Sequence, residues 1–417
     1  MDSVYHILSK EINIDSERQR YTKLYDLIRK TILDGLKKND NFKTLFSNEK
    51  LCGSYADNLK VSKPNEFDIV IRLEFPSKDY INIYPDNINK GNVFIDLTGV
   101  LTSLRRDVPK ENNMHIFLSK LINTDGLFLE NKFQQWFQSL MTEVLNKLNS
   151  TITHEDEEYK LKYRREGPAH NIVVQNIKEN TPLFSIDFVP GFVFPIEKSV
   201  SSRVPCSKLW EAIPRPLKAA GNSVQINNNP SFRTSYTDSE RVLIAGKNQM
   251  KNALRLLKKY RDLRTNMKHL KSYYIKTLFL WINEDCDKSF WNRPIFEVML
   301  VVFQRLEESL LDGKIQFFWH KELNLLQTVK SSQIKVMHCE VSKARRILEK
   351  ASKQDILDLF LSAEEQTRIT KKEMTILSDN LEEFKELNRK PFYIYISFYA
   401  LVLGIQIFRV LRKQTFI

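Results

Sequence analysis

The segment Asn65–Phe75, NEFDIVIRLEF, constrains the fold of this chain more than any other. Its apolar and polar residues alternate, which predicts a β-strand with one buried face. Side chains two residues apart in a strand project from the same face, so Glu66 and Asp68 would stand side by side. Phe67 and Ile69 would point the other way, into the core. Adjacent carboxylates repel each other, and oxygen-ligated divalent cations relieve that repulsion. The pattern favours a metal site, and two exposed acids at a sheet edge remain the simpler alternative.

A Gly-Ser pair, Gly53-Ser54, lies a dozen residues before this strand and opens a short helix expected over Tyr55–Leu59. Glycine lets the backbone approach a phosphate closely, and a turn that opens a helix offers it free amide groups and a hydroxyl. Gly-Ser pairs are common and are weak evidence when isolated. The order of the features counts: a Gly-Ser turn, then an acid-x-acid pair within an alternating strand.

A third carboxylate, Asp187, lies within LFSIDFV, among residues that otherwise favour burial. A buried aspartate is costly without a partner, so it is either hydrogen-bonded for structural reasons or part of a metal site shared with Glu66 and Asp68. Three carboxylates can hold two metal ions roughly 3.5–4 Å apart. One ion would steady a triphosphate, and the other would lower the pKa of an attacking sugar hydroxyl whose proton Asp187 could accept. We therefore predict metal-assisted phosphoryl transfer with these three acids as catalytic residues.

The chain is basic and long enough for two lobes. It has 417 residues, with 64 Lys plus Arg against 51 Asp plus Glu, which gives a formal charge of +13. Such an excess attracts polyanions, namely nucleic acid, nucleotides or an anionic membrane surface, or it only aids solubility.

The four cysteines are scattered singly and show neither zinc-ligand spacing nor a disulfide framework, which indicates free thiols in a reducing compartment. The first residues lack the basic start and apolar stretch of a secretory signal. We therefore expect a cytoplasmic protein without zinc.

The apolar periodicity predicts an α+β fold. One long amphipathic helix is expected over Ser16–Phe46. Further strands are expected at Val93–Leu97, Asn171–Gln175 and Leu183–Val189, with a helix at Lys132–Leu148. After about Cys206 the pattern becomes helical, with helices expected at Lys251–Asn266, Tyr273–Asn283, Ile295–Leu311 and Ser342–Leu361. These shifts predict a mixed-sheet core over residues 1–205, a helical lobe over 206–330 and a helical extension over 331–390.

The C-terminal residues 391–417 differ in kind from the rest. Pro391–Phe408 contains no charged residue and is flanked by basic residues on both sides. A transmembrane helix needs about 17–25 apolar residues, so this segment is at the short end. Its aromatic residues and Gln406 fit an interfacial segment equally well. A membrane anchor and a buried or partner-binding helix both remain open.

Four stretches, in this order, carry a resemblance to a known family: GSYADNLKVSKPNEFDIVIRLEFP, SIDFVPGF, NPSFRTSYTDSE and LRLLKKYRDLRTNMKHLKSYYIKTLFLWI. They resemble the active-site segments of cyclic GMP-AMP synthase and its animal relatives, the cGAS-like receptors. The resemblance spans about residues 50–330. It implies a bilobal nucleotidyltransferase fold, with a twisted mixed sheet, the long N-terminal helix as its spine and a C-terminal helical lobe.

The resemblance also implies roles for individual residues. Gly53 and Ser54 would bind the phosphates of the donor nucleotide. Glu66, Asp68 and Asp187 would hold two magnesium or manganese ions.

Five further positions match nucleotide contacts of the family. Arg233 and Glu240 fall where the family contacts the nucleobases and ribose. Arg255 matches a phosphate-directed basic residue, and Ser272 matches a phosphate or base contact. Tyr273 falls where an aromatic ring stacks on a base. A structural role remains the alternative at each position.

One departure from the vertebrate enzyme concerns zinc. That enzyme carries a His/Cys zinc-binding insert after the position of Glu240, whereas this chain has only RVLIAGKNQM there, with no His or Cys. Double-stranded DNA is therefore a less expected activator, and by analogy with insect-type members we expect double-stranded RNA. Duplex contacts read backbone and shape. The expected nucleic-acid contacts are Lys23, Lys43, Lys50, Arg241, Lys247 and Lys251.

The family thus implies an innate immune sensor that joins ATP and GTP into cyclic GMP-AMP. Two alternatives remain open at this stage. The enzyme could make another cyclic or linear oligonucleotide, or the chain could be a non-catalytic scaffold or membrane adaptor like several Mab relatives.

Overall fold

The computed structural model describes residues 2–11, 15–61, 65–105, 109–216, 228–350 and 352–388. The chain divides into two compact units, residues 1–360 and 361–417. The expected apolar segment 391–417 lies outside the described residues. Within the described part, no helix is long and apolar enough to cross a membrane.

Ten strands of the described chain form one sheet, and two short strands form a second. The strands are β1 (Phe46–Cys52), β2 (Glu66–Leu73), β3 (Asn82–Pro85), β4 (Asn92–Asp96), β5 (Thr151–His154), β6 (Glu157–Glu166), β7 (Ala169–Asn176), β8 (Thr181–Pro195), β9 (Leu209–Pro214), β10 (Ser231–Ser235), β11 (Gln316–Phe317) and β12 (His320–Asn324).

The described helices of the first unit are α1 (Asp2–Glu11), α2 (Asp15–Leu36), α3 (Asp40–Leu45), α4 (Gly53–Ala56), α5 (Thr98–Leu104), α6 (Pro109–Ser119), α7 (Glu130–Lys147), α8 (Thr237–Ile244), α9 (Asn248–Asp262), α10 (Ser272–Asp285), α11 (Ile295–Leu311), α12 (Ser331–Lys350) and α13 (Lys353–Phe360). Short 3-10 helices are η1 (Lys78–Tyr80), η2 (Ile196–Lys198), η3 (Thr265–Met267) and η4 (Phe290–Asn292). The second unit contains α14 (Ala363–Asn388). The helices expected from the sequence at 132–148, 251–266, 273–283 and 295–311 correspond to α7, α9, α10 and α11.

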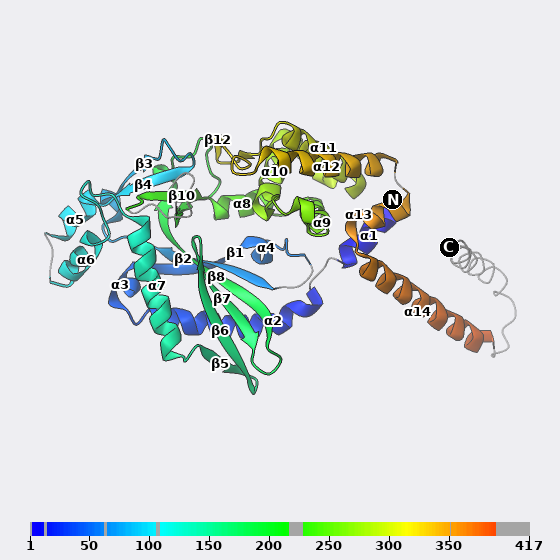
Figure 1. The fold of residues 1–417 in the computed structure, drawn as a ribbon, viewed down its shortest axis with the longest axis horizontal. Coiled ribbons are helices and arrows are strands. Elements are labelled where there is room, and N and C mark those ends of the chain that lie inside the picture. The colour runs from blue at the N-terminus through cyan, green and yellow to red at the C-terminus, as the bar shows by residue number, and fades with distance from the viewer. Residues whose placement is uncertain are drawn as a thin grey trace. The chain divides into compact units, whose positions relative to one another are not determined.

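The main sheet runs in the order β3-β4-β10-β9-β8-β7-β6-β5, with β2 paired to β8 and β1 paired to β2. Most neighbouring strands are antiparallel, whereas β2 and β8 are parallel. In Figure 1, α2 lies below strands β1 and β2, and the helices α8–α12 lie above them. The expected α+β architecture, with a mixed sheet and a helical lobe, is confirmed.

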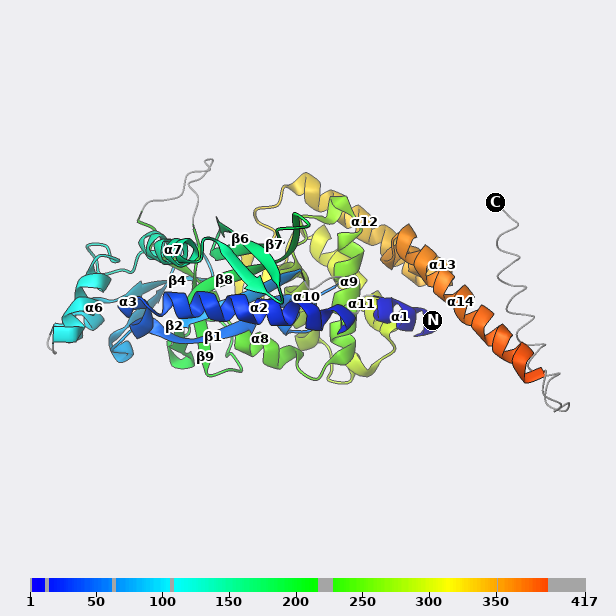
Figure 2. The same ribbon diagram turned by 90° about the horizontal axis from the view of Figure 1, so that it is seen from below.

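The buried face of β2 anchors the sheet to α2. Phe67, Ile69 and Ile71 are fully buried, as the alternation predicts. The ring of Tyr25 from α2 stacks on Phe67 with a centroid separation of 4.3 Å and an interplanar angle of 15°. Figure 2 shows α2 crossing the strands on this side. Since this face is filled by aromatic packing, the polar face of β2 must look the other way, toward α4.

The expected single helix over Ser16–Phe46 is wrong at its C-terminal end, because the chain forms two helices there. The helix α2 ends at Leu36, and α3 begins at Asp40. The reason is local capping: Asn39 has extended backbone angles, and its side chain accepts a hydrogen bond from the amide of Phe42 at 3.0 Å. The new direction buries Phe42 and Leu45.

The sequence predicted only helices after about Cys206, and this prediction is wrong because two strands, β9 and β10, lie there. They pair with each other, and they join β8 to β4 in the main sheet. Both strands are short and largely buried without a clear alternation, so they are easily missed beside long helices. The division at residues 205 and 206 stays a prediction.

The expected helix over Ser342–Leu361 is also two helices, α12 and α13. Ser352 precedes α13 and caps it: its hydroxyl accepts from the amide of Asp355 at 3.3 Å, and its own amide donates to the Asp355 carboxylate at 3.1 Å. This reciprocal pair is the capping box that starts a new helix.

A buried histidine joins α7 to the sheet. The Nε2 atom of His170 on β7 lies 2.6 Å from Oε1 of Gln134, which can only accept, so Nε2 carries the proton. The other ring nitrogen, Nδ1, accepts from the hydroxyl of Tyr163 at 2.7 Å. Burial, together with the charge of Arg165, lowers the pKa of His170 to about 3. The neutral ring is therefore the form that the fold requires.

We predict that this histidine makes folding stability depend on pH. Its folded pKa lies below its unfolded value, so its contribution is complete above the unfolded pKa near 6.5 and is lost as the pH falls toward 3. By pH 5 the loss should reach about 2 kcal/mol. In urea denaturation, His170→Gln should lose correspondingly less stability than the wild type between pH 7 and pH 5. His154→Gln on β5 is the matched control and should track the wild type. If the unfolding free energies of all three proteins changed equally with pH, the prediction would be contradicted.

Candidate active site

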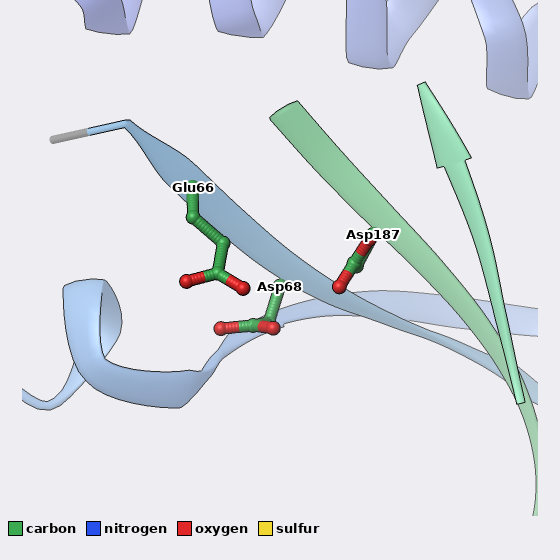
Figure 3. Close-up of side chains that lie close together, drawn as sticks. All are labelled: Glu66, Asp68 and Asp187. Atoms are coloured by element: carbon green, nitrogen blue, oxygen red, sulfur yellow. The ribbon is translucent and has the colours of Figure 1, made fainter. Parts of the chain in front are cut away.

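The polar face of β2 carries two of the three predicted carboxylates, and β8 brings the third beside them. The parallel register pairs Asp68 with Asp187. One oxygen from each of Glu66, Asp68 and Asp187 lies within 4.8 Å of the others. Figure 3 shows the three carboxylates converging from the two strands. The geometric part of the prediction, three acids brought together, is therefore present in the fold.

Gly53 packs directly against this site. It has a positive φ of +68°, and a Cβ added there would overlap the Asp68 carboxylate and lie 2.6 Å from its Cγ atom. The helix α4 that starts at Gly53 is a single turn, shorter than the expected helix over Tyr55–Leu59 and placed two residues earlier. Ser54 is half-buried in this turn. Only a residue without a side chain lets the backbone come this close to Asp68.

Burial and neighbouring negative charge raise the proton affinity of the two aspartates. Burial, then the charges of Glu66 and Asp187, raise the pKa of Asp68 to about 7. Burial also raises the pKa of Asp187, with Glu66 adding to the rise, while a hydrogen bond from Asn171 opposes it. The protein thus holds more negative charge here than its own groups neutralise. A cluster of carboxylate oxygens with this excess suits the hard divalent cations magnesium and manganese.

Asn171 on β7 orients Asp187 and was not predicted. Its amide nitrogen donates to Oδ1 of Asp187 at 2.5 Å, and the two residues are register partners across β7 and β8. The bond fixes the Asp187 carboxylate beside the other two acids. Strand pairing, which one sequence does not reveal, is the only signal that could have identified Asn171.

Two lysines near the site were also missed. Lys60 pairs with Glu66 at 3.0 Å. Lys258 on α9 is buried, and its ammonium donates to the carbonyl of Leu59 at 2.9 Å. Burial, followed by the charges of Arg261 and Lys60, lowers the pKa of Lys258 to about 8. Both lysines favour the ionised form of Asp68. They offset part of the negative charge, and Lys258 also ties α9 to the segment that follows α4.

A pocket of about 370 Å³ gathers three of the predicted nucleotide contacts. Arg233 of β10, Glu240 of α8 and Tyr273 of α10 all line it. The Tyr273 ring is 37% exposed, and the guanidinium of Arg233 lies 5.9 Å from the ring centroid of Phe317. The pocket therefore has an aromatic wall and a cation, the two features that a nucleobase with its phosphates would use.

Glu240 is more deeply engaged than its predicted role implies. Its Oε1 accepts from the Tyr273 hydroxyl at 2.6 Å and from the Trp319 indole at 3.1 Å. Its Oε2 pairs with Lys276 at 2.8 Å. Burial and the neighbouring Glu240 raise the pKa of Tyr273 well above its ordinary value. In this structure Glu240 positions the wall of the pocket.

The other two predicted nucleotide contacts lie outside the lining of this pocket. Arg255 on α9 donates to Asn252 at 2.5 Å. Ser272, the first residue of α10, accepts from Arg261 at 2.9 Å. Their assignment stays a prediction.

The six predicted nucleic-acid contacts have different surroundings. Lys50 pairs with Asp238, and Arg241 pairs with Asp57 at 3.2 Å. Burial, then the charges of Arg241 and Arg72, lower the pKa of Lys50. These two cations are therefore engaged within the fold.

The remaining four cations, Lys23, Lys43, Lys247 and Lys251, differ in their exposure and in their partners. Lys23 lies 3.6 Å from Glu155, at a pocket of about 580 Å³ lined by three glutamates. Lys43 on α3 is exposed. Lys247 is half-buried and donates to the carbonyl of Leu243, and Lys251 is half-buried as well. Lys23 and Lys43 are both exposed, and the glutamates beside Lys23 make Lys43 the more favourable contact for a polyanion.

Comparison with known proteins agrees with this geometry. The model of the Mab-21 protein nucleotidyltransferase domain matches residues 55–246, and that of the Mab-21 protein HhH/H2TH-like domain matches residues 249–343. A cyclic GMP-AMP synthase-like receptor of Lucilia cuprina is 36% identical over 86% of this chain and 95% of its own length. The chain belongs to the cyclic GMP-AMP synthase-like receptors.

Other members of this family are similarly close. Cyclic GMP-AMP synthase-like receptor 2 of Drosophila melanogaster is 34% identical over 83% of this chain and 76% of its own length. A cyclic GMP-AMP synthase-like receptor of Aethina tumida is 31% identical over 87% of this chain and 92% of its own length. The resemblance found in the sequence is thereby confirmed, and the three carboxylates lie within a nucleotidyltransferase domain.

We predict that Gly53→Ala disrupts the carboxylate site of this family member. A methyl group at Gly53 must displace Asp68, whereas Gly246, with φ +70°, has open space around it. Gly246→Ala is therefore the matched control, and backbone strain alone should cost it about 1 kcal/mol of unfolding free energy. Gly53→Ala should lose at least ~2 kcal/mol more, measured by chemical denaturation. It should also weaken Mn²⁺ binding in calorimetry. Equal losses in the two variants would show that Gly53 matters only for its φ angle.

Proposed function

We propose that this protein is an innate immune nucleic-acid sensor that makes cyclic GMP-AMP from ATP and GTP in a metal-dependent reaction. The observation that carries the proposal is the meeting of Glu66, Asp68 and Asp187 on adjacent strands, with Gly53 packed on Asp68. Membership of the receptor family supplies the class of product. A scaffold without catalysis would have no need to concentrate three mutually repelling acids.

The carboxylates would hold two magnesium or manganese ions, which, when bound, neutralise phosphate charge and acidify the attacking hydroxyl. Asp187, which accepts a hydrogen bond from Asn171, would accept the proton of that hydroxyl. The turn at Gly53-Ser54 would bind the donor phosphates with its amides and hydroxyl. Lys60 and Lys258 would favour the ionised form of Asp68, the form that acts as a metal ligand.

The nucleobase would lie in the pocket lined by Arg233 and Tyr273. The ring of Tyr273 is partly exposed, and its hydroxyl is tied to Glu240, so the face available for stacking has a fixed orientation. Stacking on such a ring tolerates both adenine and guanine. Because both phosphodiester bonds would form at one metal site, the linear intermediate has to turn around and bind again.

Double-stranded RNA is the activator that we propose. The formal charge of +13 favours a polyanion, and residues 241–250 contain no histidine or cysteine that could build a zinc-supported DNA contact. Lys30, Lys38 and Lys43 are exposed on α2, just after α2, and on α3. They supply cations on the sheet side opposite the helical lobe, where a duplex would leave the nucleotide pocket open.

Purified protein with ATP, GTP, Mn²⁺ or Mg²⁺ and double-stranded RNA should give a cyclic dinucleotide, identified by mass spectrometry and linkage-specific nuclease digestion. Asp68→Asn and Asp187→Asn should each lower the rate at least ~100-fold, because each removes a charged oxygen ligand without changing the side-chain shape. Asp358→Asn, an exposed aspartate on α13, is the control and should keep the wild-type rate.

A linear oligonucleotide as the main product would change the assigned product and keep the nucleotidyltransferase. The absence of any product with RNA, DNA and either metal would overturn the proposal in favour of a non-catalytic scaffold.

The proposed duplex site predicts a defined salt dependence. Lys38→Gln combined with Lys43→Gln should weaken double-stranded RNA binding at all sequences. The slope of log K against log salt should become shallower by roughly one for each phosphate that the variant no longer neutralises. Fluorescence anisotropy at several salt concentrations measures this slope. Lys288→Gln, an exposed lysine of the helical lobe, is the control. An unchanged slope in the double variant would show that Lys38 and Lys43 do not contact the duplex.

A further inference from the structure

The residue after α4, Asp57, is a buried carboxylate that none of the roles above includes. It caps the C-terminus of α4 and is 4% exposed. Two cations from the helical lobe reach it: Arg241 of α8 approaches Oδ1 at 3.2 Å, and Lys276 of α10 approaches Oδ2 at 2.9 Å. Both carboxylate oxygens are thus occupied by side chains that belong to a different layer of the fold.

The contacts continue from Lys276 to the nucleotide pocket. Lys276 also pairs with Glu240 at 2.8 Å, and Glu240 holds the Tyr273 hydroxyl. Burial opposes the charge of Lys276, but Glu240 and Asp57 hold its pKa above the ordinary value. A continuous series of polar contacts therefore runs from the end of α4 to the aromatic wall of the pocket.

The helix α4 depends on such contacts for its position. It has four residues, so its own hydrogen bonds cannot fix its direction. At its first residue, Gly53 rests on Asp68. At its end, Asp57 is tied to α8 and α10. The turn at Gly53-Ser54 is consequently held between the carboxylate site on one side and the helical lobe on the other.

We propose that Asp57 is a positioning residue that sets the distance between the phosphate-binding turn at Gly53-Ser54 and the base pocket at Tyr273. A nucleoside triphosphate has to reach both places at once, so the turn is useful only at one separation from the pocket. Asp57 pairs with Lys276 and Arg241, and it acts through these two cations. The inference rests on the proposed function, since it takes the ligand to be a nucleoside triphosphate.

The Asp57→Asn variant tests this role because it keeps the shape of the side chain and removes the charge that attracts both cations. Lys276 retains Glu240, so the Tyr273 wall should stay in place while α4 loses its attachment. Binding of a non-hydrolysable ATP analogue with Mg²⁺ should weaken about tenfold, whereas binding of adenosine should change less than about twofold. Isothermal titration or fluorescence quenching measures both without any need for product formation.

A double-mutant cycle sharpens the test. Because Asp57 acts through Lys276 and Arg241, Asp57→Asn should weaken ATP-analogue binding less in a Lys276→Met background, where only the Arg241 pairing is left to lose, than in the wild type. Arg345→Gln, which removes a pairing with Glu307 between α11 and α12, is the control for loss of an ion pair and should bind both ligands as the wild type does. Melting temperatures of all variants report any general loss of stability.

The outcomes separate the two proposals. Equal weakening of ATP-analogue and adenosine binding in Asp57→Asn would make Asp57 a purely structural ion-pair partner and overturn the inference. Unchanged binding of both ligands would overturn it as well. A wild-type protein that binds ATP but makes no product would contradict the proposed synthesis. The binding measurements on Asp57→Asn would still test its positioning role. A wild-type protein that binds no ATP would overturn both.

Discussion

The parallel pairing of β2 with β8 is the contact on which the site depends. Residues two apart in one strand share a face, but a third ligand has to come from a neighbouring strand, at the position that pairs with them. The register that pairs Asp68 with Asp187 meets this requirement. A shift of one residue would turn Asp187 to the opposite face, where Phe67 packs against α2. The aromatic packing on one face therefore holds the carboxylates on the other.

Bringing three acids together is electrostatically unfavourable, and the surrounding residues offset part of the repulsion. Lys60 and Lys258 place positive charge beside the acids, and Asn171 donates a hydrogen bond to Asp187. The remaining cost appears as the raised pKa of Asp68. A site that is incompletely neutralised by its own protein is disposed to bind cations, which is the condition for metal-assisted transfer of a nucleotidyl group.

Polar contacts also connect the sheet to the helical lobe. Asp57, Lys276 and Glu240 are buried or nearly so, and each is paired. Buried ion pairs contribute modestly to net stability, but they are strongly directional. In this protein they relate a one-turn helix to a pocket wall, where direction matters more than stability. The same contacts engage Arg241 with Asp57, and its predicted duplex contact stays a prediction.

The sequence by itself determined the elements whose evidence is local. Alternation predicted β2 and its buried face, helical periodicity predicted α7, α9, α10 and α11, and the order of motifs identified the family. It also named Glu66 and Asp68 as neighbours, because a strand has a fixed period of two residues. Local patterns failed at α3 and α13, where a single capping residue interrupts a longer amphipathic stretch.

Only the tertiary structure decided which distant residues meet. The partnership of Asp187 with Asn171, the approach of Gly53 to Asp68 and the engagement of Asp57 by two helices join residues far apart in the chain. Strand register and helix packing determine these contacts, and both depend on the whole core rather than on any short segment. The carboxylates could therefore be predicted from the sequence, whereas the groups that orient, neutralise and position them could not.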